Sequence, residues 1–78
     1  MNNSMKVHSD VTGKDYYPHQ GIRILNLLQA TLYIKHSCEL LDLYTTVDYN
    51  SGEPVLCFIF NREESKKYFD LWCKHELK

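Results

Sequence analysis

One short stretch limits the possible folds of this chain more than any other. Residues 54–60 read Pro-Val-Leu-Cys-Phe-Ile-Phe and form an unbroken apolar run bounded by turn residues and by Asn61. The run is too short for a stable helix, and its β-branched and aromatic residues are typical of a strand buried on both faces. Proline can open such a strand but cannot stand inside it. The sequence therefore predicts a central strand over residues 55–60.

Two further strands are predicted, one on each side of this central strand. Residues 22–25 are a short apolar stretch that places Ile22 and Ile24 on one face. Residues 40–47 alternate, which predicts a strand buried on one face only. The two predicted faces are Leu41, Leu43, Thr45 and Val47, against Asp42, Tyr44 and Thr46. The Asn-Ser-Gly turn within residues 48–53 joins this strand to the central one as a hairpin.

Two helices are predicted from capping patterns. Asn26 is followed by Gln29, and Asn61 by Glu64, as in capping boxes that begin a helix. Helices are therefore expected over residues 27–36 and 62–76. The predicted buried face of the first contains Leu27, Ala30, Tyr33 and Ile34, and that of the second contains Ser65, Tyr68, Phe69, Trp72 and Cys73.

The order of these elements predicts an α+β fold of the type β-α-β-β-α. Its three-stranded antiparallel sheet has strand 55–60 in the centre, and both helices lie on one face of the sheet. Residues 1–15 show no periodicity and are expected to form a mobile N-terminal tail, followed by a single small α+β domain over residues 16–78.

The charge and cysteine content favour an ordinary cytoplasmic protein. With a net charge of −1, the 78-residue chain has no overall electrostatic preference for nucleic acids or acidic membranes. No apolar stretch is long enough to span a membrane, and the first ten residues have no apolar leader. The three cysteines are an odd number without C-x-x-C spacing, so reduced thiols are expected.

No pattern predicts catalysis, a cofactor or a metal site. Cys73 and His75 are two residues apart on a predicted helix and face different ways. Cys73 also lies near a helix C-terminus, which disfavours the thiolate. We therefore expect no enzymatic activity. The basic residues are scattered along the chain, so a nucleic-acid-binding regulator is the alternative rather than the preferred hypothesis.

The positions that carry a family resemblance are Ile24-Leu-Asn26-x-x-Gln29-Ala30-x-x-Tyr33-Ile34, then Cys38-Glu-Leu-Leu-Asp42, Phe58-Ile-Phe60 and Trp72. Over residues 22–77 the chain resembles a family of short uncharacterised proteins encoded by phages and mobile elements of Gram-positive bacteria. Ser37 departs from that family, which tends to have glycine at this helix end. The resemblance implies a mobile-element accessory protein and no catalytic residue.

Two sequence features predict an interaction surface made of Leu28, Leu32, Asp42, Tyr44 and Thr46. The two leucines form a second stripe outside the main apolar face of the first helix. The other three alternate along an edge strand that has neither proline nor lysine to block pairing. Harmless exposure or wide burial of the leucines is the alternative interpretation. The preferred hypothesis is a small non-enzymatic interaction module that binds a host or self protein, with a homodimer favoured.

Overall fold

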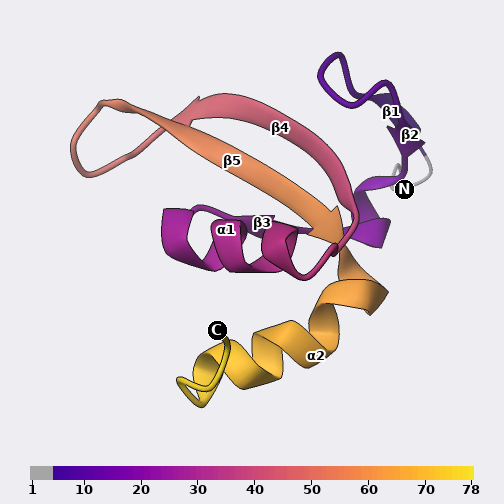
Figure 1. Cartoon of the computed structure of the whole chain (residues 1–78). Coiled ribbons are helices and arrows are strands. Elements are labelled where there is room, and N and C mark those ends of the chain that lie inside the picture. The colour runs from indigo at the N-terminus through magenta and orange to yellow at the C-terminus, as the bar shows by residue number, and fades with distance from the viewer. Residues whose placement is uncertain (1–4) are drawn as a thin grey trace.

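A computed structural model of the protein describes residues 5–78 and shows an α+β fold with two helices (Figure 1). The elements in chain order are β1 (Val7–His8), β2 (Asp15–Tyr16), a short 3-10 helix (Pro18–Gln20), β3 (Gly21–Ile24), α1 (Leu27–Lys35), β4 (Leu40–Val47), β5 (Pro54–Asn61) and α2 (Arg62–Cys73). The predicted α+β class and the three-stranded antiparallel sheet are confirmed, and β1 and β2 add a second sheet of two strands.

The three-stranded sheet has the order β3-β5-β4, and both pairs are antiparallel. β3 pairs only with residues 58–61 of β5. The other half of β5 pairs with β4 alone, in a register that places Thr45 opposite Leu56. β4 and β5 therefore extend past the end of β3 as a two-stranded ribbon that ends in the loop of residues 48–53 (Figure 1).

One face of the sheet, which we call the helix face, packs against α1 and α2. Phe58 and Phe60 of β5 share a cluster with Ala30 and Tyr33 of α1, and the rings of Tyr33 and Phe60 meet edge to face with centroids 5.1 Å apart. Trp72 of α2 is half-buried at the border of this cluster. Both helices lie below β4 and β5 in Figure 1, and the main core lies between the sheet and the helices.

A β-bulge near the start of β4 changes which residues face the helices. Leu40 lies opposite Phe60, but the next register pair is Asp42 with Ile59, so Leu41 is an extra residue. Leu41 consequently packs on the opposite face, which we call the outer face, while Leu43 borders the helix-face cluster. The prediction that Leu41 and Leu43 share a face is therefore wrong, because regular alternation does not pass through a bulge.

Both helices begin at the predicted asparagine caps, but the side chains of Gln29 and Glu64 bind Tyr33 and Glu39 and do not return to the cap residue. Asn26 accepts a hydrogen bond from the Gln29 amide, and Asn61 accepts from the amides of both Glu63 and Glu64. α2 ends at Cys73, before the predicted residue 76, and His75 has a φ of 59°. Ser37, after α1, has a φ of 63°, which is the left-handed conformation that glycine adopts at lower cost.

α1 is rotated about its axis relative to the prediction. Leu27 and Ile34 were expected in the core, but they are 61% and 49% exposed. Gln29 is buried instead, next to Ala30 and Tyr33, because its side-chain amide donates a hydrogen bond of 3.0 Å to the Tyr33 hydroxyl. A hydrogen-bonded amide can be buried at little cost, which periodicity of apolar residues does not take into account.

The outer face of the sheet is covered by a hairpin that the sequence analysis did not predict. Over residues 7–15, where a mobile tail was expected, β1 pairs with β2 and Ser9 is buried in the turn between them. Val7 and Tyr16 of this hairpin pack against Leu41, Cys57 and Ile59. Residues 1–4 of the expected tail lie outside the described part of the chain.

Candidate interaction surface

The backbone of β4 has one side that faces away from β5, and its polar groups can be assigned from the hairpin register. The Asp48 N–H donates to the Glu53 carbonyl at 2.9 Å, and Asp48 lies one position beyond the pair of Val47 with Pro54. Because antiparallel pairs alternate, Thr46 and Tyr44 also bond to β5. Leu43, Thr45 and Val47 therefore direct their N–H and C=O groups outwards.

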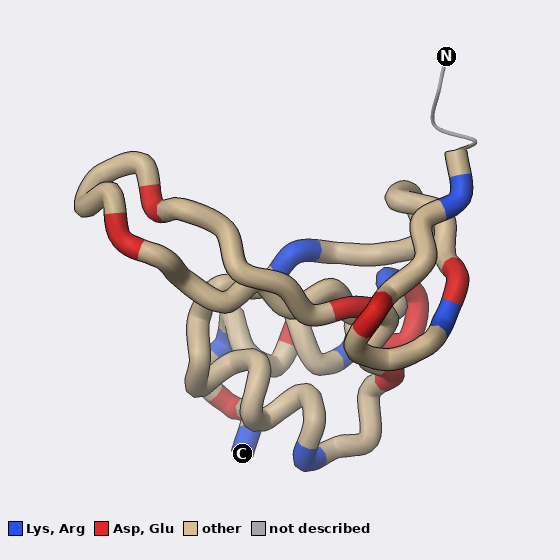
Figure 2. Tube along the Cα trace, turned by 90° about the horizontal axis from the view of Figure 1, so that it is seen from above, with Lys and Arg blue, Asp and Glu red and all other residues tan. Residues whose placement is uncertain are grey.

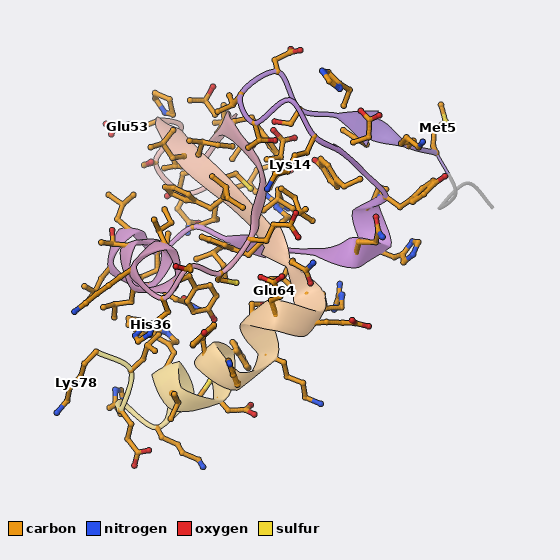
Figure 3. The ribbon with its side chains drawn as sticks, turned by 45° about the vertical axis from the view of Figure 1, so that its right-hand side comes forward. Met5, Lys14, His36, Glu53, Glu64 and Lys78 are labelled. Carbon is orange, nitrogen blue, oxygen red and sulfur yellow. The ribbon has the colours of Figure 1, made fainter. Side chains whose placement is uncertain are left out.

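The start of this side of β4 is covered by the turn of the N-terminal hairpin. The Thr12 hydroxyl donates to the Leu41 carbonyl at 2.8 Å, and Lys14 Nζ donates to the Leu40 carbonyl at 3.3 Å. Lys14 also pairs with Glu39 at 3.2 Å. Figure 3 labels Lys14 where the hairpin meets the sheet. The hairpin thus satisfies the carbonyls of Leu40 and of the bulge residue Leu41.

Asp42, at the end of the covered part of β4, belongs to a buried hydrogen-bond network. Its carboxylate accepts hydrogen bonds from the Tyr16 hydroxyl at 2.6 Å and from the Leu43 N–H at 2.8 Å. Burial raises the pKa of Asp42, but hydrogen bonds from Ser9, Tyr16 and Leu43 lower it more, so the pKa lies below its usual value. Burial and the hydrogen bond to Asp42 raise the pKa of Tyr16. Asp42 therefore anchors the hairpin, and both of its carboxylate oxygens already accept hydrogen bonds.

Residues 43–47 form what we call the open β4 edge. The outward N–H and C=O groups of Thr45 and Val47, and the C=O of Leu43, have no hydrogen-bond partner among residues 5–78. The edge contains no charged residue and no proline, and Figure 2 shows this part of the tube between acidic residues at both ends. Uncharged open edges of this kind pair readily with another strand.

The structure places the five predicted interface residues in different environments. Tyr44 is 41% exposed and Leu28 is 60% exposed, so both are accessible. Thr46 is half-buried, and Leu32 packs partly against the helix-face core. Asp42 is only 8% exposed and belongs to the Tyr16 network, so it is not a free edge residue. The predicted surface is thus divided between α1 and the open β4 edge.

The sequence did not identify Thr45 and Val47 as the residues with open backbone groups. Their side chains were assigned to the buried face of β4, so neither was included in the predicted interaction surface. The loop closure at Asp48 determines which residues point outwards, and it could not be read without the register. Leu27 and Ile34, which the helical periodicity placed in the core, join Leu28 on the exposed side of α1.

An open groove of about 690 Å³ lies on the outer face between the N-terminal hairpin and β4. Val7 and Val11 of the hairpin line one side, and Arg23 and Tyr44 are part of the sheet side. The groove lies beside the open β4 edge. A strand that pairs with this edge would therefore point every second side chain towards the end of the groove that Tyr44 lines.

The described residues offer little material for covalent or metal chemistry. All three cysteines are free, and burial followed by the nearby Glu64 and Glu39 raises the pKa of the Cys38 thiol to about 11. Over residues 5–78 there is no group of three or more His, Cys, Asp and Glu side chains placed to hold a metal ion. No helix in the same range is long and apolar enough to cross a membrane.

These features define a small α+β protein with one covered and one open stretch along a sheet edge. Comparison with models of known families, with curated proteins and with solved structures gives no match for this chain.

Proposed function

We propose that this protein is a non-enzymatic interaction module that binds an extended protein segment as an additional strand beside β4. The observation that supports this most is the row of unpaired backbone groups at Leu43, Thr45 and Val47. An extended partner satisfies these groups by backbone pairing, and its alternate side chains provide the specificity.

The side chains next to this edge define the partner's chemistry. Leu43 borders the helix-face core, Tyr44 lies in the outer groove, and Thr46 is half-buried. None of the five edge residues is charged. The partner segment is therefore an uncharged strand with β-branched or aromatic side chains, which are the types that pair best across strands.

The exposed leucines of α1 are a second contact region in this proposal. Leu27 and Leu28 are 61% and 60% exposed, and Ile34 is 49% exposed. Three large aliphatic side chains on one helix of nine residues are more than isolated surface exposure. A partner that occupies the open β4 edge and also reaches α1 buries this apolar area.

The proposed biological setting is that of a phage or mobile-element accessory protein acting in the cytoplasm. The family resemblance supports this setting, although Asn26 and Tyr33, which carry part of the resemblance, serve as a helix cap and as a core residue. Three free thiols fit a reducing compartment.

The test uses a matched pair of variants at Thr45. Thr45→Pro removes the outward N–H without removing a bond to β5, because proline is tolerated where the N–H faces away from the sheet. Thr45→Val keeps the N–H and the β-branched shape. We expect peptides selected from a displayed random library to bind the wild type and Thr45→Val but not Thr45→Pro. Bound peptides should shift the amide NMR signals of Thr45 and Val47.

Binding of peptides with no effect of Thr45→Pro would contradict the proposed edge. Polynucleotide binding that weakens steeply with salt and does not involve β4 would favour the nucleic-acid-binding alternative instead.

A further inference from the structure

We infer that a second copy of this chain can occupy the open β4 edge, so that two β4 strands pair antiparallel about a twofold axis at Thr45. The inference rests on the proposed function, because it uses the same edge. The product is one sheet of six strands, in the order β3-β5-β4 and then the same strands of the second copy in reverse. An interface of this kind is isologous, since each copy contributes the same residues.

The boundaries of the open β4 edge select this register. The edge begins after the part held by Thr12, which occupies the Leu41 carbonyl, and it ends at Val47, before the turn that starts at Asp48. A twofold axis at Thr45 pairs Leu43 with Val47 of the second copy, so the open residues of both copies meet along their whole length. An axis at residue 44 pairs Val47 with Leu41, whose carbonyl is taken, and an axis at residue 46 pairs Leu43 with Tyr49 in the turn.

Four backbone hydrogen bonds can form between the two copies in this register. Two Thr45 residues face each other and exchange two hydrogen bonds, as outward-facing residues do in an antiparallel pair. Val47 N–H reaches the Leu43 carbonyl of the second copy, and the symmetry repeats this bond. Leu43 N–H is already bound to the Asp42 carboxylate, so it does not donate to the Val47 carbonyl of the second copy, and that carbonyl gains no backbone partner in this register.

The side chains opposite each other are also compatible. Leu43 lies opposite Val47, Thr45 opposite Thr45, and Tyr44 opposite Thr46 of the second copy. Pairs of aliphatic, β-branched and aromatic side chains across strands are favourable. All of these residues are uncharged, so pairing requires no charge to be buried.

The same register places Asp42 opposite Asp48 of the second copy at both ends. Repulsion between these carboxylates limits the affinity, and five paired residues per copy bury much less than the roughly 1,600 Å² of a standard interface. We therefore expect a weak dimer, with a Kd of tens to hundreds of micromolar. Because salt screens the two repulsive pairs, the dimer should become tighter as ionic strength rises.

Sedimentation equilibrium over roughly 10 μM to 1 mM tests the inference, a range that brackets the expected Kd. The wild type and Thr45→Val should shift from 9.3 kDa towards twice that mass, and Thr45→Pro should stay monomeric. Asp48→Asn keeps the side-chain oxygen that accepts from the Asn50 N–H, and it should tighten the dimer by about 2- to 10-fold. Circular dichroism establishes that each variant is folded. If the Thr45→Pro variant does not fold, Thr45→Lys is used in its place, because it puts a charge at the twofold axis.

Three results would overturn the dimer: a single 9.3-kDa species at all concentrations, a dimer that Thr45→Pro leaves intact, or a dimer that Asp48→Asn and salt both weaken. A monomeric wild type that still captures peptides in a Thr45-dependent way removes the dimer and leaves the proposed function standing. A dimer that survives Thr45→Pro, with peptide capture equally unaffected, removes both.

Discussion

The two faces of the three-stranded sheet are closed in different ways. On the helix face, Phe58 and Phe60 pack against Ala30 and Tyr33 of α1, and α2 adds half-buried aromatic residues. On the outer face, a hairpin with two strands of two residues each covers a smaller cluster (Figure 1). That hairpin is anchored by polar contacts, of which the bond from Tyr16 to Asp42 is buried.

Because they are closed differently, the two faces should respond to different perturbations. Apolar packing contributes in proportion to the area removed from water and depends little on pH. A buried hydrogen bond to a carboxylate depends on single atoms and on the charge of one group. The outer face should therefore open locally before the helix face unfolds.

The largest effect is expected from a truncation on the helix face. Phe60 is completely buried, so Phe60→Ala should cost about 3–5 kcal/mol, which is a large part of the stability of so small a domain. Urea unfolding followed by circular dichroism measures this. Ile59→Val, on the adjacent outer-face position, should cost only about 0.5–1.5 kcal/mol. A loss below about 1 kcal/mol for Phe60→Ala would contradict its place in the main core.

Tyr16→Phe should produce a smaller and more local effect. It removes one hydroxyl from a buried carboxylate and should cost about 1.5–3 kcal/mol. Amide hydrogen exchange should accelerate in residues 7–16 and leave β5 protected. Tyr49→Phe is the control, because Tyr49 is fully exposed and its loss of a hydroxyl should change nothing. Uniform acceleration across β5 would show that the hairpin does not open independently.

The outer face should also depend on pH in both directions. The lowered pKa of Asp42 stabilises the fold above the usual value of about 3.9, and this contribution is lost as pH falls through the folded pKa. The hydrogen bond to Asp15 raises the pKa of His8, so that contribution is present below about 6.5 and is lost as pH rises through the folded pKa. Hairpin amides should exchange most slowly between these limits.

Asp42→Asn provides the control for the acidic side of this profile. It should remove most of the change in hairpin exchange between pH 5 and pH 3, values that bracket the usual aspartate pKa of about 3.9. A hairpin whose exchange, corrected for the intrinsic rate, is independent of pH would contradict the role of both groups.

The smallest effects are expected at two left-handed positions, one on each side of the sheet. Ser37 ends α1 with a φ of 63°, so Ser37→Gly should stabilise the protein by about 0.5–1 kcal/mol. Gly13, in the hairpin turn, has a φ of 75° and no atom near an added Cβ, so Gly13→Ala should cost about 1 kcal/mol through conformation alone. Thermal unfolding measures both, and changes of the opposite sign would contradict them.

Features that depend on neighbouring residues could be predicted from the local sequence. Asn26 and Asn61 cap the two helices as the capping patterns predict, and the turn before Pro54 forms the hairpin of β4 and β5. Of the predicted central strand, Cys57 to Phe60 are buried, whereas Leu56 is 41% exposed because β3 ends before reaching it. Caps and turns form within a few residues, so local patterns are sufficient to specify them.

The placement of the candidate site depends on contacts between segments that are distant in the sequence. The bulge at Leu41, the rotation of α1 around Gln29 and the hairpin over residues 7–16 each depend on contacts with distant segments. Ser9, Gly13 and Tyr16 were the available signals for the hairpin, but a short polar stretch does not reveal the buried carboxylate that will hold it. The sequence could suggest an open strand edge, whereas only long-range packing fixed which of its backbone groups remain unpaired.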